Sequence, residues 1–541
     1  MDFLYTPKRE AASFAQRSVV MARRGMVASS QHLATMAGYR ALARGGNAVD
    51  AAVAMVSTLN VVEPHSVGIG GDAFALLYLA KENRLVGMNA SGRAPYAATR
   101  EWYREQGFRT MPEEGILSIT VPGALHGWAQ AIERHGRLGL EEVLEEAIHY
   151  AGEGFPVSEV IAGEWAEAEM KLKASPQAAG TFLPQGRPPR PGEVFRNPDL
   201  AASLTAITAN GAQELYQGKL GRTLVDYAAG RGGLLESRDL RDHTTTWVEP
   251  LTLDYRGHTI CQLPPNGQGL TALEMLNILE GYDLKGLGHN NPELLHLLIE
   301  AKKIAFADRD YYVTDPEFEP APVKTLLSRG YGSRARGRIK RDQVLDLTGP
   351  FLGPPSSETV YVCAVDQEGN AASFISSIFM AFGSGEVVEG TGIVLQNRGA
   401  SFSLDPGHPN RLEPHKRPMH TIIPGMVFKD GRFLMAYGVM GGDMQPQGHV
   451  QFLVNLLDFG MNPQEALDAP RFRHLGGRTV YLEEGISQET EEALKDKGHL
   501  IDRGPYLVNQ VGGGQAILLD QEEQVLLGAS DRRKDGCATG F

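Results

Sequence analysis

Two apolar runs separated by a short polar stretch constrain this chain more than any other feature. Residues 360–365 are rich in β-branched and aromatic side chains, as is typical of a buried strand. The polar residues 366–370 follow, and Gly369 can adopt a positive φ, so we expect a turn there. A second apolar run, 371–382, then returns. The sequence therefore predicts a buried β-hairpin with Thr359 at its open end.

A threonine at that position has a chemical option that other threonines lack. If the Glu358–Thr359 bond were cut, Thr359 would carry a hydroxyl and an α-amine on adjacent carbons. An α-amine has an ordinary pKa of about 8, so it can accept the hydroxyl proton near pH 7 without a separate histidine. The alternative is that Thr359 is an ordinary strand residue, and the hairpin alone does not decide between the two.

Further hairpin and helix signals are spread along the whole chain. Three further strand pairs are predicted, with apolar helices between them. Residues 98–245 are expected to be mostly helical, with an exposed loop at 176–198. The fold class that accommodates these elements is α+β, with two antiparallel sheets between helical layers, an αββα four-layer sandwich. The strand pairs are 73–79 with 85–89, 421–428 with 433–439 and 514–520 with 524–529, and the main apolar helices are 48–59, 270–279, 293–308 and 447–457.

Composition narrows the classes of protein to consider. The 541 residues carry a formal net charge of −13 without a dense basic block, which argues against nucleic acid as a partner. The three cysteines, Cys261, Cys363 and Cys537, are far apart and form no CxxC motif. Neither a leader-like apolar segment nor a membrane-spanning run is evident, so we expect a soluble, cytoplasmic protein that does not bind a membrane.

Several common motifs were tested and set aside. Gly68-x-Gly70 is followed by a predicted strand and not by a helix, which does not fit a phosphate-binding loop. Gly383-Ser384-Gly385 superficially suggests a serine nucleophile, but glycine-flanked serines are usually turns. No histidine pair has metal-ligand spacing on an expected helix, so we predict neither a metal nor a cofactor.

Six distinctive segments are spread over nearly the full length of the chain. They are 41–50 (ALARGGNAVD), 62–74 (VEPHSVGIGGDAF), 121–123 (VPG), 264–269 (PPNGQG), 300–316 (EAKKIAFADRDYYVTDP) and 466–472 (ALDAPRF). Through these segments the sequence resembles the γ-glutamyltranspeptidase family of N-terminal-nucleophile hydrolases. The resemblance implies an αββα sandwich, self-cleavage and an acyl-enzyme mechanism. It implies a large subunit, 1–358, and a small subunit, 359–541, that stay together as one intertwined body, possibly as a dimer of heterodimers.

The resemblance also assigns roles to catalytic residues. Thr359 matches the family's nucleophile, which opens the small subunit and serves as its own base. Gly441 and Gly442 match the glycine pair whose backbone N–H groups bind the oxyanion, and one such donor is typically worth about 3 kcal/mol in the transition state. Ser377 lies where the family has a threonine that hydrogen-bonds the nucleophile. Alternatively, the glycines form a plain turn and Ser377 is an ordinary strand residue.

Departures from the family concern the substrate. By register, Phe379, Arg398 and Ser401 replace three polar residues that hold the substrate's α-amino group. An α-ammonium beside Arg398 would be repelled, whereas an acyl group that carries a carboxylate could be gripped by this arginine. Other substrate-binding positions are also altered. Ser91 replaces the carboxylate-binding arginine, Arg93 follows two residues later and could assist Arg398, and His420 and Thr421 replace the family's paired serines. Each arginine could instead be a structural ion-pair partner.

The sequence thus predicts a self-processing amidohydrolase with a small-molecule amide substrate. Its connector 404–417 is shorter than the family's lid segment, which favours hydrolysis over transfer. The γ-glutamyl compounds of the family and amides such as oxamate or glutaryl amides both remain possible substrates. The pattern at 397–403 resembles a non-standard subgroup that includes glutathione hydrolase-like proteins, glutaryl-cephalosporin acylases and oxamate amidohydrolases. From a different class, the chain could be an inactive relative that serves as a scaffold.

Overall fold

The computed structural model describes residues 15, 17–346, 358–505 and 508–541. The glycine- and proline-rich linker predicted at 349–355 lies outside these residues. Within them, no helix combines the length and the apolar composition needed to cross a bilayer.

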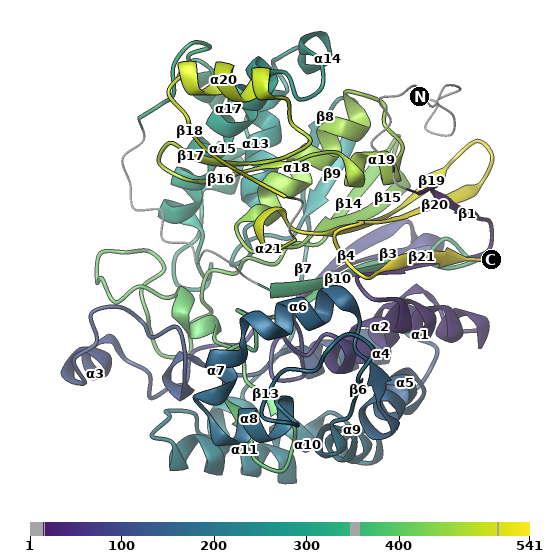
Figure 1. Cartoon of the computed structure of the whole chain (residues 1–541), viewed down its shortest axis with the longest axis vertical. Coiled ribbons are helices and arrows are strands. Elements are labelled where there is room, and N and C mark those ends of the chain that lie inside the picture. The colour runs from purple at the N-terminus through teal and green to yellow at the C-terminus, as the bar shows by residue number, and fades with distance from the viewer. Residues whose placement is uncertain (1–14, 16, 347–357, 506–507) are drawn as a thin grey trace.

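The predicted hairpin forms the centre of a seven-stranded sheet (Figure 1). Strand β10 (Glu358–Val365) pairs with β11 (Ala371–Phe379), and Gly369 in the turn has φ 83°. The Asp366 N–H donates to the Asn370 carbonyl at 3.0 Å and closes the turn. All pairs in this sheet are antiparallel. The strand order is β21 (Cys537–Gly540), β2 (Met26–Ser29), β10, β11, β3 (Asp72–Leu79), β4 (Arg84–Ala90) and β7 (Thr246–Val248).

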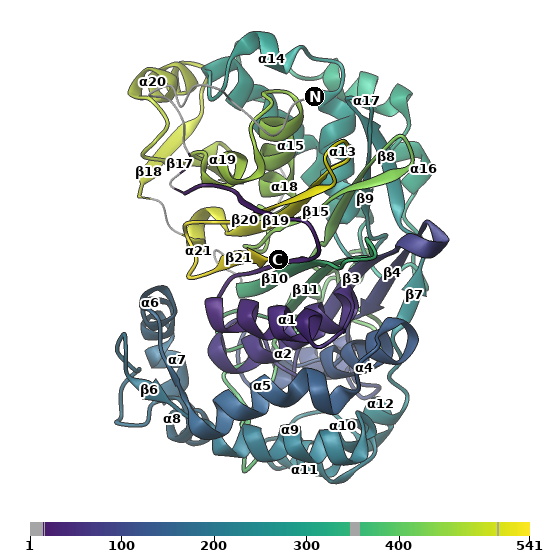
Figure 2. The same cartoon turned by 90° about the vertical axis from the view of Figure 1, so that its right-hand side faces the viewer.

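A second sheet of seven antiparallel strands stacks on the first (Figure 2). It contains the two other predicted C-terminal hairpins, β14 with β15 and β19 with β20. Its order is β1 (Val20–Ala22), β20 (Val525–Ser530), β19 (Gly514–Asp520), β15 (Arg432–Val439), β14 (Gly425–Lys429), β9 (His258–Gln262) and β8 (Leu251–Tyr255).

The alternation of side chains along β10 explains how the layers pack. Val360, Val362 and Ala364 belong to the core shared with the helices below the first sheet. Tyr361 and Cys363 belong to the core between the two sheets. A strand that is buried on both faces needs apolar residues at every position, which is why this segment shows no polar alternation.

Helices cover the outer face of each sheet and complete four layers (Figures 1 and 2). The predicted helix 48–59 is the buried α2, which Asn47 and Asp50 cap reciprocally at its start. Below the first sheet lie α1 (His32–Ala43), α2 (Ala48–Val62), α4 (Ala124–His135), α5 (Leu140–Glu153) and α9 (Pro198–Asn210). Above the second lie α13 (Gly269–Leu279), α15 (Pro292–Tyr312), α18 (Met444–Leu457), α19 (Pro463–Asp468) and α20 (Gln488–Asp496). The αββα prediction is confirmed.

Two local expectations were wrong or incomplete. The segment 176–198 is not simply a loop, because it begins with α8 (Pro176–Phe182), where Ser175 caps the helix and Pro176 occupies its first turn. Proline there starts a helix, although it would break one further along. The sequence also gave no signal for a small sheet formed by β16 (Phe472–Gly476), β17 (Thr479–Glu483) and β18 (Leu500–Gly504).

Candidate active site

Thr359 lies at the second position of β10 and is 1% exposed. Its Oγ1 donates to Ser377 Oγ across the hairpin at 3.4 Å. The register between β10 and β11 shifts between Glu358 and Val360, so regular pairing is interrupted next to Thr359. The hairpin therefore brings together the two hydroxyls that the sequence predicted as nucleophile and partner.

Ser377 is the centre of a small hydrogen-bond network. Its hydroxyl donates to the carbonyl of Glu358 at 2.7 Å, which is the carbonyl of the predicted cleavage bond. Its Oγ accepts the N–H of Phe379 at 2.8 Å and Arg398 Nη2 at 3.4 Å. Ser377 thus contacts the predicted nucleophile, the predicted cleavage bond and the predicted substrate-binding arginine.

Arg398 is fully buried beside this network and has an unusual environment for a cation. Its Nη1 donates to Thr421 Oγ1 at 2.9 Å, and its guanidinium lies 4.0 Å from the ring centroid of Phe379. Among the described residues, no carboxylate lies within ion-pair distance of Arg398, and its Nε has no acceptor. Burial lowers the pKa of Arg398 to about 9, although the charges of Asp72 and Asp443 oppose this shift. A buried cation without a counter-ion is the feature expected of a site that binds an anion.

Phe379 has the backbone conformation that makes this stacking possible. It ends β11 with φ 82°, in the left-handed region that side chains other than glycine rarely adopt. The strain is compensated locally, because the Phe379 N–H bonds to Ser377 and its ring lies against the guanidinium.

Arg93 does not share the environment of Arg398. Its guanidinium contacts Asp315 at 3.1 Å and both oxygens of Glu317 at 2.8 and 2.9 Å. These two carboxylates neutralise it, which favours the structural ion-pair alternative over substrate binding for Arg93. Ser91, where the family has its arginine, hydrogen-bonds Asn89 at 2.7 Å.

His420 is held by an aspartate that the sequence analysis overlooked. Its Nε2 lies 2.9 Å from Asp72 Oδ2, and burial together with the charge of Arg398 lowers the pKa of His420 to about 4. The other oxygen of Asp72 accepts the Gly92 N–H at 2.7 Å and Gln396 Nε2 at 3.0 Å. An acidic residue that opens an apolar strand is the signal that could have identified Asp72.

Ser401 and Thr421 differ in how closely they join the site. Thr421 contacts Arg398 directly. Ser401 follows Arg398 in a short 3-10 helix (Arg398–Ser401), and its buried hydroxyl has no hydrogen-bond partner in the described part of the chain. Its predicted role in substrate binding stays a prediction.

Gly441 and Gly442 lie after β15 with φ 111° and 58°, which favours glycine at both positions. Neither N–H donates to another group within the described residues. Gln268 Nε2 holds this turn by donating to the Thr421 carbonyl at 2.7 Å and the Gly442 carbonyl at 3.0 Å. Gln268 in turn accepts Arg309 Nη1 at 2.9 Å. Gln268 and Arg309 also escaped the sequence analysis, although both lie in family-like segments.

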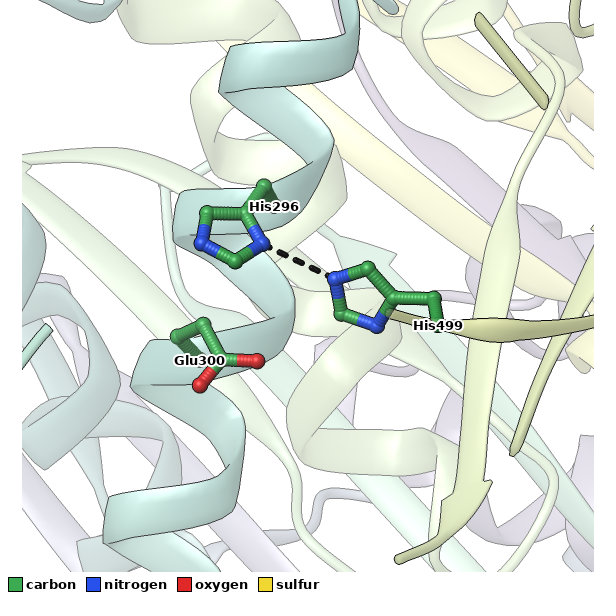
Figure 3. Close-up of side chains that lie close together, drawn as sticks. All are labelled: His296, Glu300 and His499. Atoms are coloured by element: carbon green, nitrogen blue, oxygen red, sulfur yellow. Dashed lines mark hydrogen bonds between the residues drawn. The ribbon is translucent and has the colours of Figure 1, made fainter. Parts of the chain in front are cut away.

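Two buried clusters have ligand types that suit a metal, namely His296, Glu300 and His499 (Figure 3), and His65, Glu164 and Glu358. In the first, His296 Nδ1 lies 2.8 Å from His499 Nε2, and the ammonium of Lys303 is 2.7 Å from Glu300. In the second, the ammonium of Lys534 is 2.9 Å from Glu164. In each cluster a lysine ammonium already contacts one of the carboxylates, so we assign no metal to either.

Two stacked antiparallel sheets between helical layers, with a hydroxyl at the head of a central strand, define an N-terminal-nucleophile hydrolase fold. The chain belongs to the γ-glutamyltranspeptidase family, whose model matches residues 34–541.

Individual relatives cover almost the whole chain. The chain is 40% identical to the glutathione hydrolase-like YwrD proenzyme of Bacillus subtilis strain 168, over 96% of this chain and 99% of the relative. It is 36% identical to the oxamate amidohydrolase proenzyme of Klebsiella pneumoniae, over 96% and 98%. The crystal structure of a cephalosporin acylase from Bacillus halodurans superposes with a TM-score of 0.92 at 41% identity and covers 99% of both chains. The chain is therefore similar to hydrolases of this family that differ in the substrates their names state.

Proposed function

We propose that this protein is a self-cleaving amidohydrolase that acts on amides of a small acyl group with a terminal carboxylate. Cleavage between Glu358 and Thr359 would give subunits 1–358 and 359–541, and Thr359 would then attack the substrate. The observation that carries the substrate class is Arg398, which is buried, has no carboxylate partner in the described part of the chain, and is hydrogen-bonded to Ser377. A substrate carboxylate would supply the missing counter-ion.

Self-cleavage needs a route for the Thr359 proton, because the α-amine is still part of a peptide bond in the precursor. The hydrogen bonds suggest a relay through Ser377. Thr359 Oγ1 donates to Ser377, and Ser377 donates to the Glu358 carbonyl. As Oγ1 forms a bond to the Glu358 carbonyl carbon, Ser377 can take its proton and pass its own to the carbonyl oxygen. The C–N bond then breaks with a proton returned to nitrogen, and water hydrolyses the resulting ester.

In the mature enzyme, the free α-amine of Thr359 acts as the base for its own hydroxyl. The substrate's acyl carbonyl carbon forms an ester with Oγ1 and releases an amine or ammonia. The unused N–H groups of Gly441 and Gly442 are suited to bind the oxyanion. Water then regenerates Thr359, and we favour this hydrolysis over transfer to a second amine.

Oxamate or a glutaryl amide fits this proposal better than a γ-glutamyl compound. The α-ammonium of a γ-glutamyl group needs a carboxylate, and the two carboxylates whose charges act on Arg398 already have cationic or imidazole partners, Asp72 with His420 and Asp443 with Arg309. The names of relatives refer to oxamate, to cephalosporin and to glutathione, so the names alone do not decide which amide this chain hydrolyses. A cytoplasmic location is part of the same proposal.

Intact-mass measurement of the purified protein and of Thr359→Ala tests the proposal first. We expect two fragments that meet at Glu358/Thr359 in the wild type and a single uncut chain in the variant. Ammonia or amine release is then measured with oxamate, a glutaryl amide and glutathione, and we expect the first two to be hydrolysed faster. A wild-type chain that stays uncut under all conditions would contradict the mechanism and favour the inactive scaffold.

A further inference from the structure

A group of buried charged side chains lies near enough to the side chain of Glu358 to shift its pKa. It consists of Glu63 at the end of α2, His65, Glu164 of α6 (Glu159–Glu167) and Lys534, each at most 8% exposed. One ligand atom each of His65, Glu164 and Glu358 lies within 4.8 Å of the others. The catalytic cycle proposed above uses none of these surrounding residues.

Glu164 links His65 and Lys534. Its carboxylate contacts His65 Nε2 at 2.7 Å and Lys534 Nζ at 2.9 and 3.0 Å. The backbone carbonyl of His65 accepts the Phe382 N–H at 2.9 Å, just beyond β11, which carries Ser377. The group is therefore fixed relative to the same hairpin that holds the predicted cleavage bond.

The charges in this group are not balanced if every carboxylate is ionised. Burial opposes ionisation of Glu164, but Lys534 and His65 lower the pKa of Glu164 to about 2. Burial alone would lower the pKa of His65, yet its hydrogen bond to Glu164 raises it overall. Burial, together with the charge of Glu164, raises the pKa of Glu358, and burial also raises the pKa of Glu63. Three carboxylates face two cations, so a proton on either of the two carboxyls with a raised pKa, Glu358 or Glu63, relieves the excess negative charge.

We propose that Glu63, His65, Glu164 and Lys534 form a binding site for the Glu358 side chain in the uncut precursor, which fixes the Glu358 carbonyl against Ser377. The carbonyl and the side chain belong to one residue, so anchoring the side chain restricts the peptide group that accepts the 2.7 Å hydrogen bond from Ser377. Glu358 is thus a positioning residue for self-cleavage, in its protonated form. This inference rests on the self-cleavage proposed above.

The test compares self-cleavage rates of freshly translated chains. Wild type, Glu358→Gln and Glu358→Ala are made in a cell-free translation system, moved to buffers from pH 6 to 9, and followed by gel and intact mass. Glutamine keeps the size of glutamate and imitates its protonated form, whereas alanine removes the anchor. We expect Glu358→Ala to cleave at least tenfold more slowly at pH 7. The rate of Glu358→Gln relative to wild type should rise at least threefold from pH 6 to 9, because wild-type Glu358 loses its proton.

Dividing the cleavage rate of Glu358→Gln by the wild-type rate at the same pH removes the general effect of pH on the Thr359 hydroxyl. Glu523→Gln, an exposed glutamate in a turn, is the matched control and should follow wild type at every pH. Equal cleavage rates in all the Glu358 variants, with a ratio that does not change with pH, would overturn the inference while leaving self-cleavage intact. A wild type that never cleaves would instead overturn self-cleavage itself. Melting temperatures of the uncut chains establish that Glu358→Ala is folded.

Discussion

At the scale of single residues, the two arginines Arg93 and Arg398 show that burial alone does not define a role. Arg93 forms ion pairs with Asp315 and Glu317, so its charge is already balanced within the protein. Arg398 is buried more completely, and among the residues that the structure describes its partners are two hydroxyls and an aromatic ring. A buried charge without a counter-ion reduces stability, and proteins retain such groups mainly at functional sites.

Replacing Arg398 by methionine should therefore separate stability from activity. We expect Arg398→Met to abolish hydrolysis of a carboxylate-bearing amide and to raise the free energy of unfolding by about 1–4 kcal/mol, as when a buried ion is replaced by an apolar side chain. Thermal melting and kcat/KM check the two effects. Arg93→Met is the matched control and should lower the melting temperature, because it leaves Asp315 buried without its partner. A less stable Arg398→Met would show that the arginine is structural.

At the scale of elements, helix α15 fixes the segment 340–345, which precedes Glu358 in the sequence. His296 Nε2 contacts the Lys340 carbonyl at 2.7 Å, and Glu300 accepts the Leu345 N–H at 2.8 Å (Figure 3 shows His296 and Glu300 one turn apart). Lys303 pairs with Glu300 at 2.7 Å, and both side chains are at most 2% exposed. The carbonyl of Lys340 can only accept, so His296 carries its proton on Nε2 and accepts from His499 at Nδ1.

Removing one partner of the Lys303–Glu300 ion pair should lower the free energy of unfolding more than removing both partners. We expect Lys303→Met to lower the free energy of unfolding by about 3–5 kcal/mol, because Glu300 is then buried without its cation. The double variant Glu300→Met/Lys303→Met should lose less than Lys303→Met alone. Chemical denaturation of the uncut Thr359→Ala chain measures both without interference from cleavage. If the double variant loses as much free energy of unfolding as the two single variants together, the two residues are not coupled.

At the scale of the whole molecule, the two predicted subunits are interleaved within both sheets. In the first sheet, β2 of the predicted large subunit lies between β21 and β10 of the predicted small subunit, and β11 of the small subunit lies beside β3 of the large one. In the other sheet, β1 lies beside β20, and β9 lies beside β14. The cores that hold the layers together include residues from both sides of the predicted cleavage bond.

The fragments should consequently remain associated after cleavage. We expect a cut sample to elute in gel filtration at the same position as the uncut Thr359→Ala chain and to separate into 1–358 and 359–541 only in denaturant. Because each sheet would lose strands from its middle, separation must expose the shared cores to water. Fragments that separate under native conditions would contradict this interleaved arrangement of the subunits.

The sequence by itself determined the hairpin, Thr359 at its open end and the four-layer arrangement. These features follow from local patterns, namely apolar runs of strand length, turn residues such as Gly369, and helices apolar on every side. Only the tertiary structure decided which polar groups meet. Asp72 and His420 are 348 positions apart, and Arg93 and Asp315 are 222 apart. Charge and hydrogen bonding act through space, so the isolation of Arg398 and the crowding of carboxylates around Glu358 emerge only when the chain is folded.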